Sequence, residues 1–153
     1  MQEDVHICPN VVTYICILKA CTIVGSLQIG EYIAAEVRKR GLLHKDVVLG
    51  TALVDMYAKC GALEKAQEVF ECLPMRNVVT WSALITGYTQ HGLGDEALKC
   101  YMQMQDAGVC PNLVTYMCVL SIYVRICITC IVLCTHTYKC MSNIWIHKQI
   151  CRR

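Results

Sequence analysis

CPNVVTY at residues 8–14 returns as CPNLVTY at residues 110–116, and VVTW at residues 78–81 is a third copy of the same motif. The two outer copies begin 102 residues apart. Self-similarity at a period of roughly 20 to 50 residues indicates a stack of structural repeats. The sequence is therefore predicted to be a repeat protein.

The motif copies, with the glycine turns between them, set the boundaries of the repeats. Three units cover residues 11–46, 47–77 and 78–112, and they are 36, 31 and 35 residues long. These are called the first, second and third units below. Residues 1–10 would end a preceding repeat, and residues 113–121 would begin a further one.

Each unit has the pattern of two amphipathic helices joined by a glycine turn. In the third unit, Trp81, Leu84 and Ile85 recur at helical spacing on a first helix that is predicted to end near Gly92. A second helix follows, which Gly108 is placed to close in a left-handed conformation. One such hairpin cannot bury both of its apolar faces, so neighbouring hairpins must stack. The predicted fold is all-α, an α-solenoid with a concave inner surface.

Composition is consistent with a packed core and says little about partners. The 153 residues are 56% apolar and carry a formal net charge of +2, which is too small to indicate nucleic-acid binding by charge alone. Thirteen cysteines could form a secreted disulfide framework, but the chain opens with polar, acidic residues in place of a secretory signal. We therefore expect reduced cysteines of an intracellular protein, most of them at small buried positions. Because the first arginine is Arg38, no organellar transit peptide is visible.

Several motifs resemble the pentatricopeptide repeat. They are VVTWSALI at residues 78–85, DEAL at 95–98, GVCPN at 108–112 and ALVDMYAKCG at 52–61. The order of unit lengths looks like the long, short and standard repeats of the plant PLS-type subfamily, which is linked to organellar RNA editing. The resemblance covers residues 8 to about 121. The nearest rival is the tetratricopeptide repeat, which has units of about 34 residues and binds peptides.

The resemblance implies a right-handed superhelix that binds single-stranded RNA, with other RNA-editing or processing factors as candidate partners. It implies a mitochondrial or chloroplast protein that has no catalytic activity, no cofactor and no small-molecule substrate. The chain departs from the family pattern in the first unit, which carries one extra residue between Gly41 and Asp46. It departs again after Ser121, where the motif is lost.

In the resembled family, each repeat reads one base with the fifth and the last residue of the unit. These residues are Thr51 and Asn77 in the second unit, and Ser82 and Asn112 in the third. Both pairs resemble the family combination for adenine. The second residue of a unit would pack against the base faces, which assigns that role to Val48, Val79 and Val114.

Two positions do not fit this reading, and other readings stay open. Ile15 and Met117 occupy the fifth position of the first and fourth units, where they offer no hydrogen bond. Ser, Thr and Asn near helix starts are also ordinary capping and turn residues. The basic run 38–40, with His44 and Lys45, could contact phosphate, but cations at the end of a helix also complement its dipole. A peptide-binding scaffold and a non-functional truncated gene product remain alternative functions.

Motifs for catalysis and metal binding are weak. None of the five histidines is followed by glutamate two residues later, as a zinc deaminase requires. Cys127 and Cys130 have the spacing of half a zinc site but lack a second pair, so no metal site is predicted. GLGDEA at residues 92–97 matches a relaxed dinucleotide motif, yet it joins two predicted helices instead of following a strand.

The end of the chain does not follow the repeat pattern. Residues 122–134 contain no glycine and no acidic residue, and the cysteine-rich segment 122–153 is predicted to be a non-repeat, aberrant tail of a truncated or mispredicted product. A membrane span is not expected, because Arg125 interrupts the apolar run and leaves it shorter than the roughly 18 residues that a bilayer requires.

Overall fold

The computed structural model describes residues 9–43 and 45–129, and all regular structure in these ranges is helical. Six helices form three hairpins, followed by a further helix over residues 113–129. In chain order the six helices are α1 (Val11–Val24), α2 (Leu27–Lys39), α3 (Val47–Lys59), α4 (Leu63–Cys72), α5 (Val78–Gln90) and α6 (Gly94–Asp106). The predicted all-α fold is confirmed.

Short polar side chains begin the first helix of each hairpin. Asn10, Asp46, Asn77 and Asn112 each accept hydrogen bonds from backbone N–H groups of the following turn, over 2.8–3.0 Å. These bonds satisfy donors that a helix leaves unpaired at its N-terminus. The second helices α2, α4 and α6 have no side-chain cap of this kind. The repeating cap therefore marks the start of every unit.

Glycines in the left-handed conformation close the first helices. Gly25, Gly61 and Gly92 have φ values of 72°, 82° and 78°, which residues other than glycine rarely adopt. Gly108, with φ of 70°, follows α6 as the sequence predicts. In the shorter second unit, α4 has only 10 residues and ends before Leu73 and Pro74 without such a glycine.

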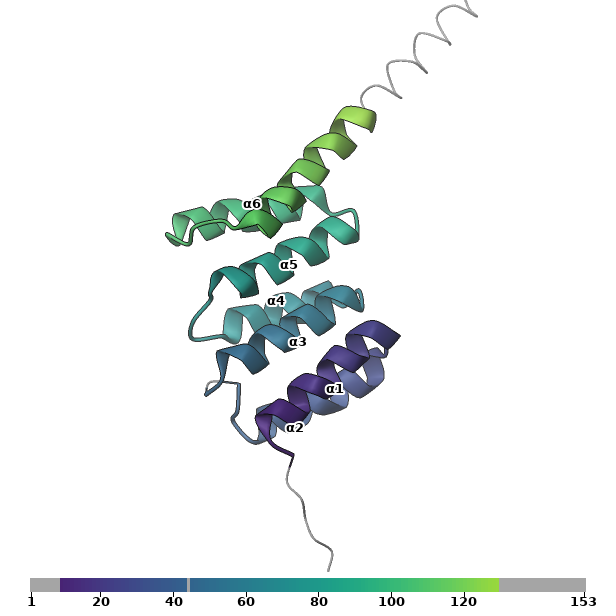
Figure 1. The fold of residues 1–153 in the computed structure, drawn as a ribbon, viewed down its shortest axis with the longest axis vertical. Helices are drawn as coiled ribbons and strands as arrows, with labels where there is room; N and C mark the ends of the chain where they lie inside the picture. Colours follow the sequence, from purple (N-terminus) through teal and green to yellow (C-terminus); the bar gives the residue numbers. More distant parts are fainter. Residues whose placement is uncertain (1–8, 44, 130–153) are drawn as a thin grey trace, which may run out of the picture.

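The hairpins stack so that the first helices form one continuous layer (Figure 1). α3 packs directly against both α1 and α5. Among the described residues, α2 does not pack closely against α4, nor α4 against α6, although an ion pair between Lys65 and Glu31 links α4 to α2. Because first helices are closer together than second helices, the stack curves with the first helices on its inner side.

The core lies between the two layers and between successive hairpins. Gly87 on α5 lets the helix approach α3 so closely that an added Cβ would lie 2.5 Å from the Cβ of Ala58. The Phe70 ring of α4 meets Trp81 of α5 edge to face, with ring centroids 4.5 Å apart. Leu84 and Ile85 are fully buried on the same side of α5. These contacts hold the second and third hairpins together.

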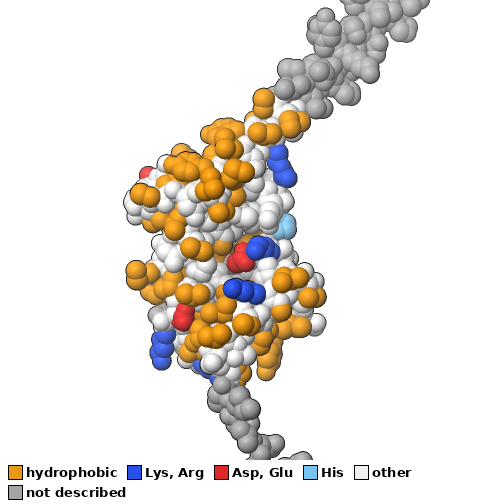
Figure 2. All heavy atoms as spheres, in the orientation of Figure 1, with side chains coloured by type: hydrophobic (Ala, Val, Ile, Leu, Met, Phe, Trp, Pro, Cys, Tyr) orange, Lys and Arg blue, Asp and Glu red, His pale blue; other side chains and the backbone are white. Residues whose placement is uncertain are grey.

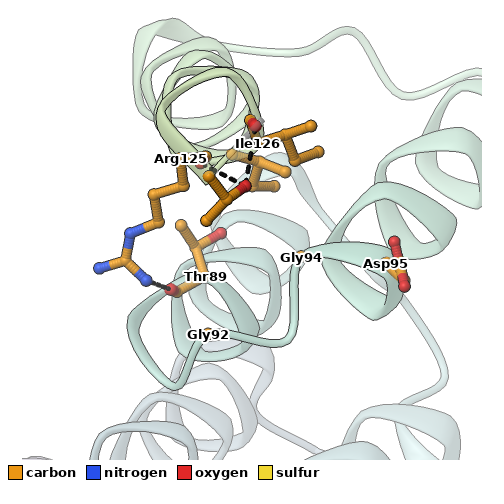
Figure 3. Close-up of a pocket in the computed structure, with 8 residues that line it drawn as sticks. Thr89, Gly92, Gly94, Asp95, Arg125 and Ile126 are labelled. Carbon is orange, nitrogen blue, oxygen red and sulfur yellow. Dashed lines mark hydrogen bonds between the residues drawn. The ribbon is translucent and has the colours of Figure 1, made fainter. Parts of the chain in front are cut away.

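The helix over residues 113–129 continues without a break across the predicted boundary between residues 121 and 122. Ile122 is 3% exposed, and Arg125 donates from Nη1 to the Thr89 carbonyl at the end of α5, over 3.4 Å. Figure 3 shows this contact beside a pocket of about 320 Å³ between the turn after α5 and the last helix. The rest of the predicted tail lies outside the described residues.

The cysteines differ in part from expectation. The eight described cysteines are all free thiols, but only Cys21 and Cys100 are buried. Cys60 and Cys118 are half-buried, and the other four are exposed. Burial raises the pKa of the Cys100 thiol to about 11. Among the described helices, none combines the length and apolar character needed to cross a membrane.

Candidate functional site

A groove of about 470 Å³ runs along the inner layer, and residues from α1, α3, α5 and the start of the last helix line it. Its walls repeat with the period of the hairpins. The second residue of a unit supplies Val48, Val79 and Val114, and the fifth supplies Ile15, Thr51 and Ser82. Six of the seven predicted base-contacting residues line this groove: Val48, Thr51, Val79, Ser82, Asn112 and Val114.

The three valines present apolar surface to solvent. Val48, Val79 and Val114 are 63%, 55% and 49% exposed. Most other apolar residues of α3 and α5 are buried, whereas the helix over residues 113–129 exposes much of its apolar surface. Such exposure is not required for the stacking of helices, since the core lies on the other side. The face in Figure 2, on which the first helices lie nearest the viewer, is largely apolar and uncharged, with a few charged side chains near its centre.

In the third unit, the two predicted reading residues contact each other. Ser82 Oγ lies 3.3 Å from Asn112 Oδ1 and 2.6 Å from the Val78 carbonyl, and it can donate its proton to either acceptor. The Ser82 side chain is 6% exposed, so its hydroxyl lies at the floor of the groove. The fifth and last residues of this unit, 30 positions apart in sequence, therefore meet at one point.

In the second unit, the corresponding pair is joined through a third residue. Asn77 does not line the groove, in contrast to the prediction that all four polar residues share it. Thr80 Oγ1 donates to Asn77 Oδ1 over 3.0 Å and lies 2.8 Å from Thr51 Oγ1. Thr51 Oγ1 also lies 2.8 Å from the Val47 carbonyl. The hydroxyl of Thr80 thus bridges the two predicted reading residues.

Capping and presentation to the groove use different atoms of Asn77 and Asn112. The Oδ1 of each residue accepts the backbone bonds of the cap, as the capping interpretation predicts. The Nδ2 of each residue has no hydrogen-bond partner among residues 9–43 and 45–129. An asparagine in this geometry satisfies its helix and keeps two N–H donors for a ligand.

The first unit has the same order of helices but lacks the polar bridge. Asp46 caps α3 through bonds to Val48 N and Leu49 N. Ile15 holds the fifth position, and Leu49 takes the place that Thr80 holds one hairpin later. Because neither Ile15 nor Leu49 carries a hydroxyl, no side-chain bond links the fifth position to the last residue.

Three charged residues line the groove beyond the predicted set. Lys59 and Asp55 form an ion pair at 2.9 Å, and Lys19 has no charged partner among the described residues. The groove therefore carries one excess positive charge. The basic run 38–40 is not part of it, since Arg38 and Lys39 lie in the last turn of α2, and His44 is outside the described residues.

Sequence reasoning missed the ninth position of each unit. Lys19, Asp55 and Thr86 line the groove one helical turn beyond the fifth residues, at a spacing of four. Residues four apart lie on the same face of a helix, so this spacing was the signal that could have found them. Within the described part of the chain, no cluster of His, Cys, Asp or Glu could hold a metal ion.

Comparison with known families covers most of the chain. The model described as the PPR repeat family matches residues 76–125, the pentatricopeptide repeat domain model matches residues 2–43, and the PPR repeat model matches residues 51–78. The first of these matches crosses the predicted boundary at residue 121.

Similar proteins come from Arabidopsis thaliana and are much longer. Two pentatricopeptide repeat-containing proteins are 46% and 48% identical to this chain over 113 and 121 residues, which is 74% and 79% of this chain but 17% and 22% of theirs. A third, named as chloroplastic, is 42% identical over 74% of this chain and 13% of its own length. The match therefore spans only 13–22% of the length of these relatives.

Solved structures show the same fold. The crystal structure of the pentatricopeptide repeat protein PPR10 from maize matches with a TM-score of 0.64 and 22% identity, over 80% of this chain and 18% of that chain. The structure of PPR10 in complex with an 18-nt psaJ RNA element matches with a TM-score of 0.66 and 23% identity, over 76% of this chain and 18% of that chain. With the stacked hairpins and the three matching models, these comparisons establish that the chain belongs to the pentatricopeptide repeat family.

Proposed function

We propose that the groove binds single-stranded RNA at one nucleotide per hairpin, and that the second and third units favour adenine. The observation that carries the proposal is the recurrence of an exposed valine and a hydroxyl on adjacent first helices, close to an asparagine amide. A fold of this kind needs none of these three features for its own stacking. Their repetition once per hairpin suits a polymer such as RNA, in which each nucleotide repeats the same chemical groups.

The direction of the hydrogen bonds supports adenine. Thr51 and Ser82 both have internal acceptors for their protons, so their oxygens are left to accept a bond from the ligand. The Nδ2 groups of Asn77 and Asn112 are left to donate. The Watson–Crick edge of adenine offers one donor, N6–H, and one acceptor, N1, whereas guanine offers the opposite order.

The remaining groove residues suit the other parts of a nucleotide. Val48, Val79 and Val114 recur once per hairpin along the groove, and a base would pack between successive apolar side chains. Lys19 carries the excess positive charge of the groove and suits a phosphate. The charge is small, so binding would depend less on salt than in strongly basic RNA-binding proteins.

The family relationship extends the proposal to the whole protein. The unit boundaries 11–46, 47–77 and 78–112, and the assignment to the PLS-type subfamily, belong to this proposal. So do a role in organellar RNA processing or editing and a site of action in a mitochondrion or chloroplast. The longer Arabidopsis relatives, one of them named as chloroplastic, support this extension.

The test is a fluorescence-anisotropy titration with oligouridine that carries two adjacent adenines, compared with the same RNA carrying two guanines. We expect the adenine RNA to bind about tenfold or more tightly, since a well-made base contact discriminates by about 1–3 kcal/mol. Val79→Asp should weaken binding, because it places a carboxylate against the base and phosphate path.

Met102→Asp is the matched control, because Met102 is also more than half exposed but lies on the second helix α6. It should leave RNA affinity unchanged. Equal affinity of the wild-type chain for the two RNAs would contradict the proposed reading. Equal loss in the two variants would place the binding surface elsewhere.

A further inference from the structure

We propose that Thr80 is a positioning residue, which orients the Asn77 amide and so sets the base preference of the second unit. This inference rests on the proposed function. It adds a residue at the third position of a unit, which contacts no base itself, to the pair that reads the base. It also explains how Asn77, which does not line the groove, can act together with Thr51.

Thr80 lies where a hydroxyl is costly unless it is bonded. Its side chain is completely buried on α5, so the Oγ1 atom has no access to water. Oγ1 is 3.0 Å from Asn77 Oδ1 and 2.8 Å from Thr51 Oγ1, which satisfies it on both sides. A buried valine would fill nearly the same volume without these bonds, so the hydroxyl has a role beyond packing.

The cap and the bridge together fix which end of the Asn77 amide faces outward. Oδ1 accepts from Val79 N, Thr80 N and Thr80 Oγ1, each at a distance of 3.0 Å. A flipped amide would place Nδ2 against two backbone N–H donors, which cannot bond to it, and would lose the bond that Thr80 Oγ1 donates. The Nδ2 donors are therefore held away from the helix.

The same bridge sets the direction of the Thr51 hydroxyl. Either Thr80 donates to Asn77 and accepts from Thr51, or Thr80 donates to Thr51 while Thr51 donates to the Val47 carbonyl. In both arrangements the Thr51 hydroxyl donates within the protein, to Thr80 or to the Val47 carbonyl, so its oxygen presents lone pairs to the groove. Through one hydroxyl, Thr80 defines a donor at Asn77 and an acceptor at Thr51, the order that adenine requires.

The third unit shows what happens where this bridge is weaker. Thr115 holds the equivalent position, but its Oγ1 donates to the Asn112 carbonyl over 2.7 Å and is 3.4 Å from Asn112 Oδ1. There Ser82 reaches Asn112 directly. We therefore expect the preference of the third unit to depend on Ser82 and much less on Thr115.

The experiment compares Thr80→Val with the wild-type chain on RNAs that carry adenine or guanine opposite the second unit, with adenine kept opposite the third. We expect the adenine-to-guanine affinity ratio at the second unit to fall about fivefold, which corresponds to one hydrogen bond. The ratio at the third unit should not change. A structural role alone would lower affinity for all RNAs equally and leave both ratios intact.

Two control variants separate positioning from stability. Thr89→Val removes another buried hydroxyl of α5, which donates to the Ile85 carbonyl and takes no part in the bridge. It should leave both ratios at their wild-type values, as should Thr115→Val. A fall of the second-unit ratio in Thr89→Val as large as in Thr80→Val would overturn the inference.

A measurement without RNA distinguishes failure of this inference from failure of the proposed function. The heteronuclear NOE of the Asn77 side-chain amide should fall in Thr80→Val and stay at its wild-type value in Thr89→Val. If wild-type protein showed no base preference but the NOE fell, the proposed function would be wrong and the positioning of Asn77 would stand. An unchanged NOE together with an unchanged base ratio would overturn the role of Thr80.

Discussion

The first and second hairpins share the same plan of capped first helix, glycine turn and second helix, but differ in the side chains that connect one to the next. Both begin their first helix after a polar cap and close it with a left-handed glycine, Gly25 and Gly61. In the second hairpin, Thr51, Thr80 and Asn77 form a polar bridge, whereas the first hairpin has Ile15, Leu49 and Asp46 at the same places. The residues that stack the hairpins are therefore separate from those that we propose to read the base, although both lie on the same helices.

The largest expected effect concerns what the hairpins share. Leu84→Ala should lower the free energy of unfolding by about 2–5 kcal/mol, because it leaves a cavity at a fully buried position of α5. Urea unfolding followed by circular dichroism measures this. Val79→Ala, on the exposed side of the same helix, should change stability by less than about 0.5 kcal/mol. Similar losses of stability in the two variants would mean that the exposed side of α5 contributes to stacking as much as the buried side does.

Gly87→Ala tests the close approach of α5 to α3. The added methyl would meet the Ala58 side chain at 2.5 Å, so we expect a loss of about 1–3 kcal/mol despite the better helix propensity of alanine. The double variant Gly87→Ala with Ala58→Gly removes the clash and should recover part of the loss in thermal unfolding. No recovery would show that the cost arises elsewhere.

Asn77→Ala and Asn77→Asp separate the two uses of one side chain. The alanine variant loses the cap of α5 and should be less stable by about 1 kcal/mol. The aspartate variant keeps acceptors for the backbone N–H groups, as Asp46 does for α3, and should retain wild-type stability in thermal melts. It should nevertheless lose the preference for adenine. If both variants melted alike, the amide oxygen would not be the cap.

The smallest expected effect comes from giving the first hairpin what it lacks. Ile15→Ser adds a hydroxyl at the fifth position, opposite the Asp46 carboxylate, which can accept the N–H donors of guanine. We expect a new guanine preference of about threefold, or roughly 0.6 kcal/mol, at one additional nucleotide. Titration with RNAs that vary only this nucleotide measures it. A gain for adenine instead would contradict the assignment of donors and acceptors.

Much of this architecture could be predicted from the sequence. The apolar spacing around Trp81 and Leu84, the turn glycines and the closing Gly108 are local signals, and the structure places each as predicted. Local signals fail where long-range contacts decide. The bond between Thr51 and Thr80 joins residues 29 positions apart and depends on the distance between α3 and α5. The spacing of apolar residues in the sequence does not predict that distance.

The predicted site shows the same division. Six of its seven residues line the groove because their positions follow directly from helical geometry. Asn77 does not line the groove, whereas Asn112, which caps the next helix in the same way, does. The two differ in the contact from the third residue of the next unit, which is 3.0 Å at Asn77 and 3.4 Å at Asn112. After Ser121 the sequence motif of the repeat is lost, but the helix itself continues. Ile122 is buried there beside α5 and α6.

The most direct measurement is a complete substitution series of the bound RNA, one nucleotide at a time, titrated with the wild-type chain and with Asn112→Asp. The wild-type chain should prefer adenine at two adjacent nucleotides. Asn112→Asp keeps an acceptor for the Thr115 backbone N–H but replaces the outward donor by an acceptor, so it should change the preference at one of these nucleotides from adenine to guanine. A uniform loss of affinity across all RNAs, or an altered preference at several nucleotides, would contradict one hairpin reading one base.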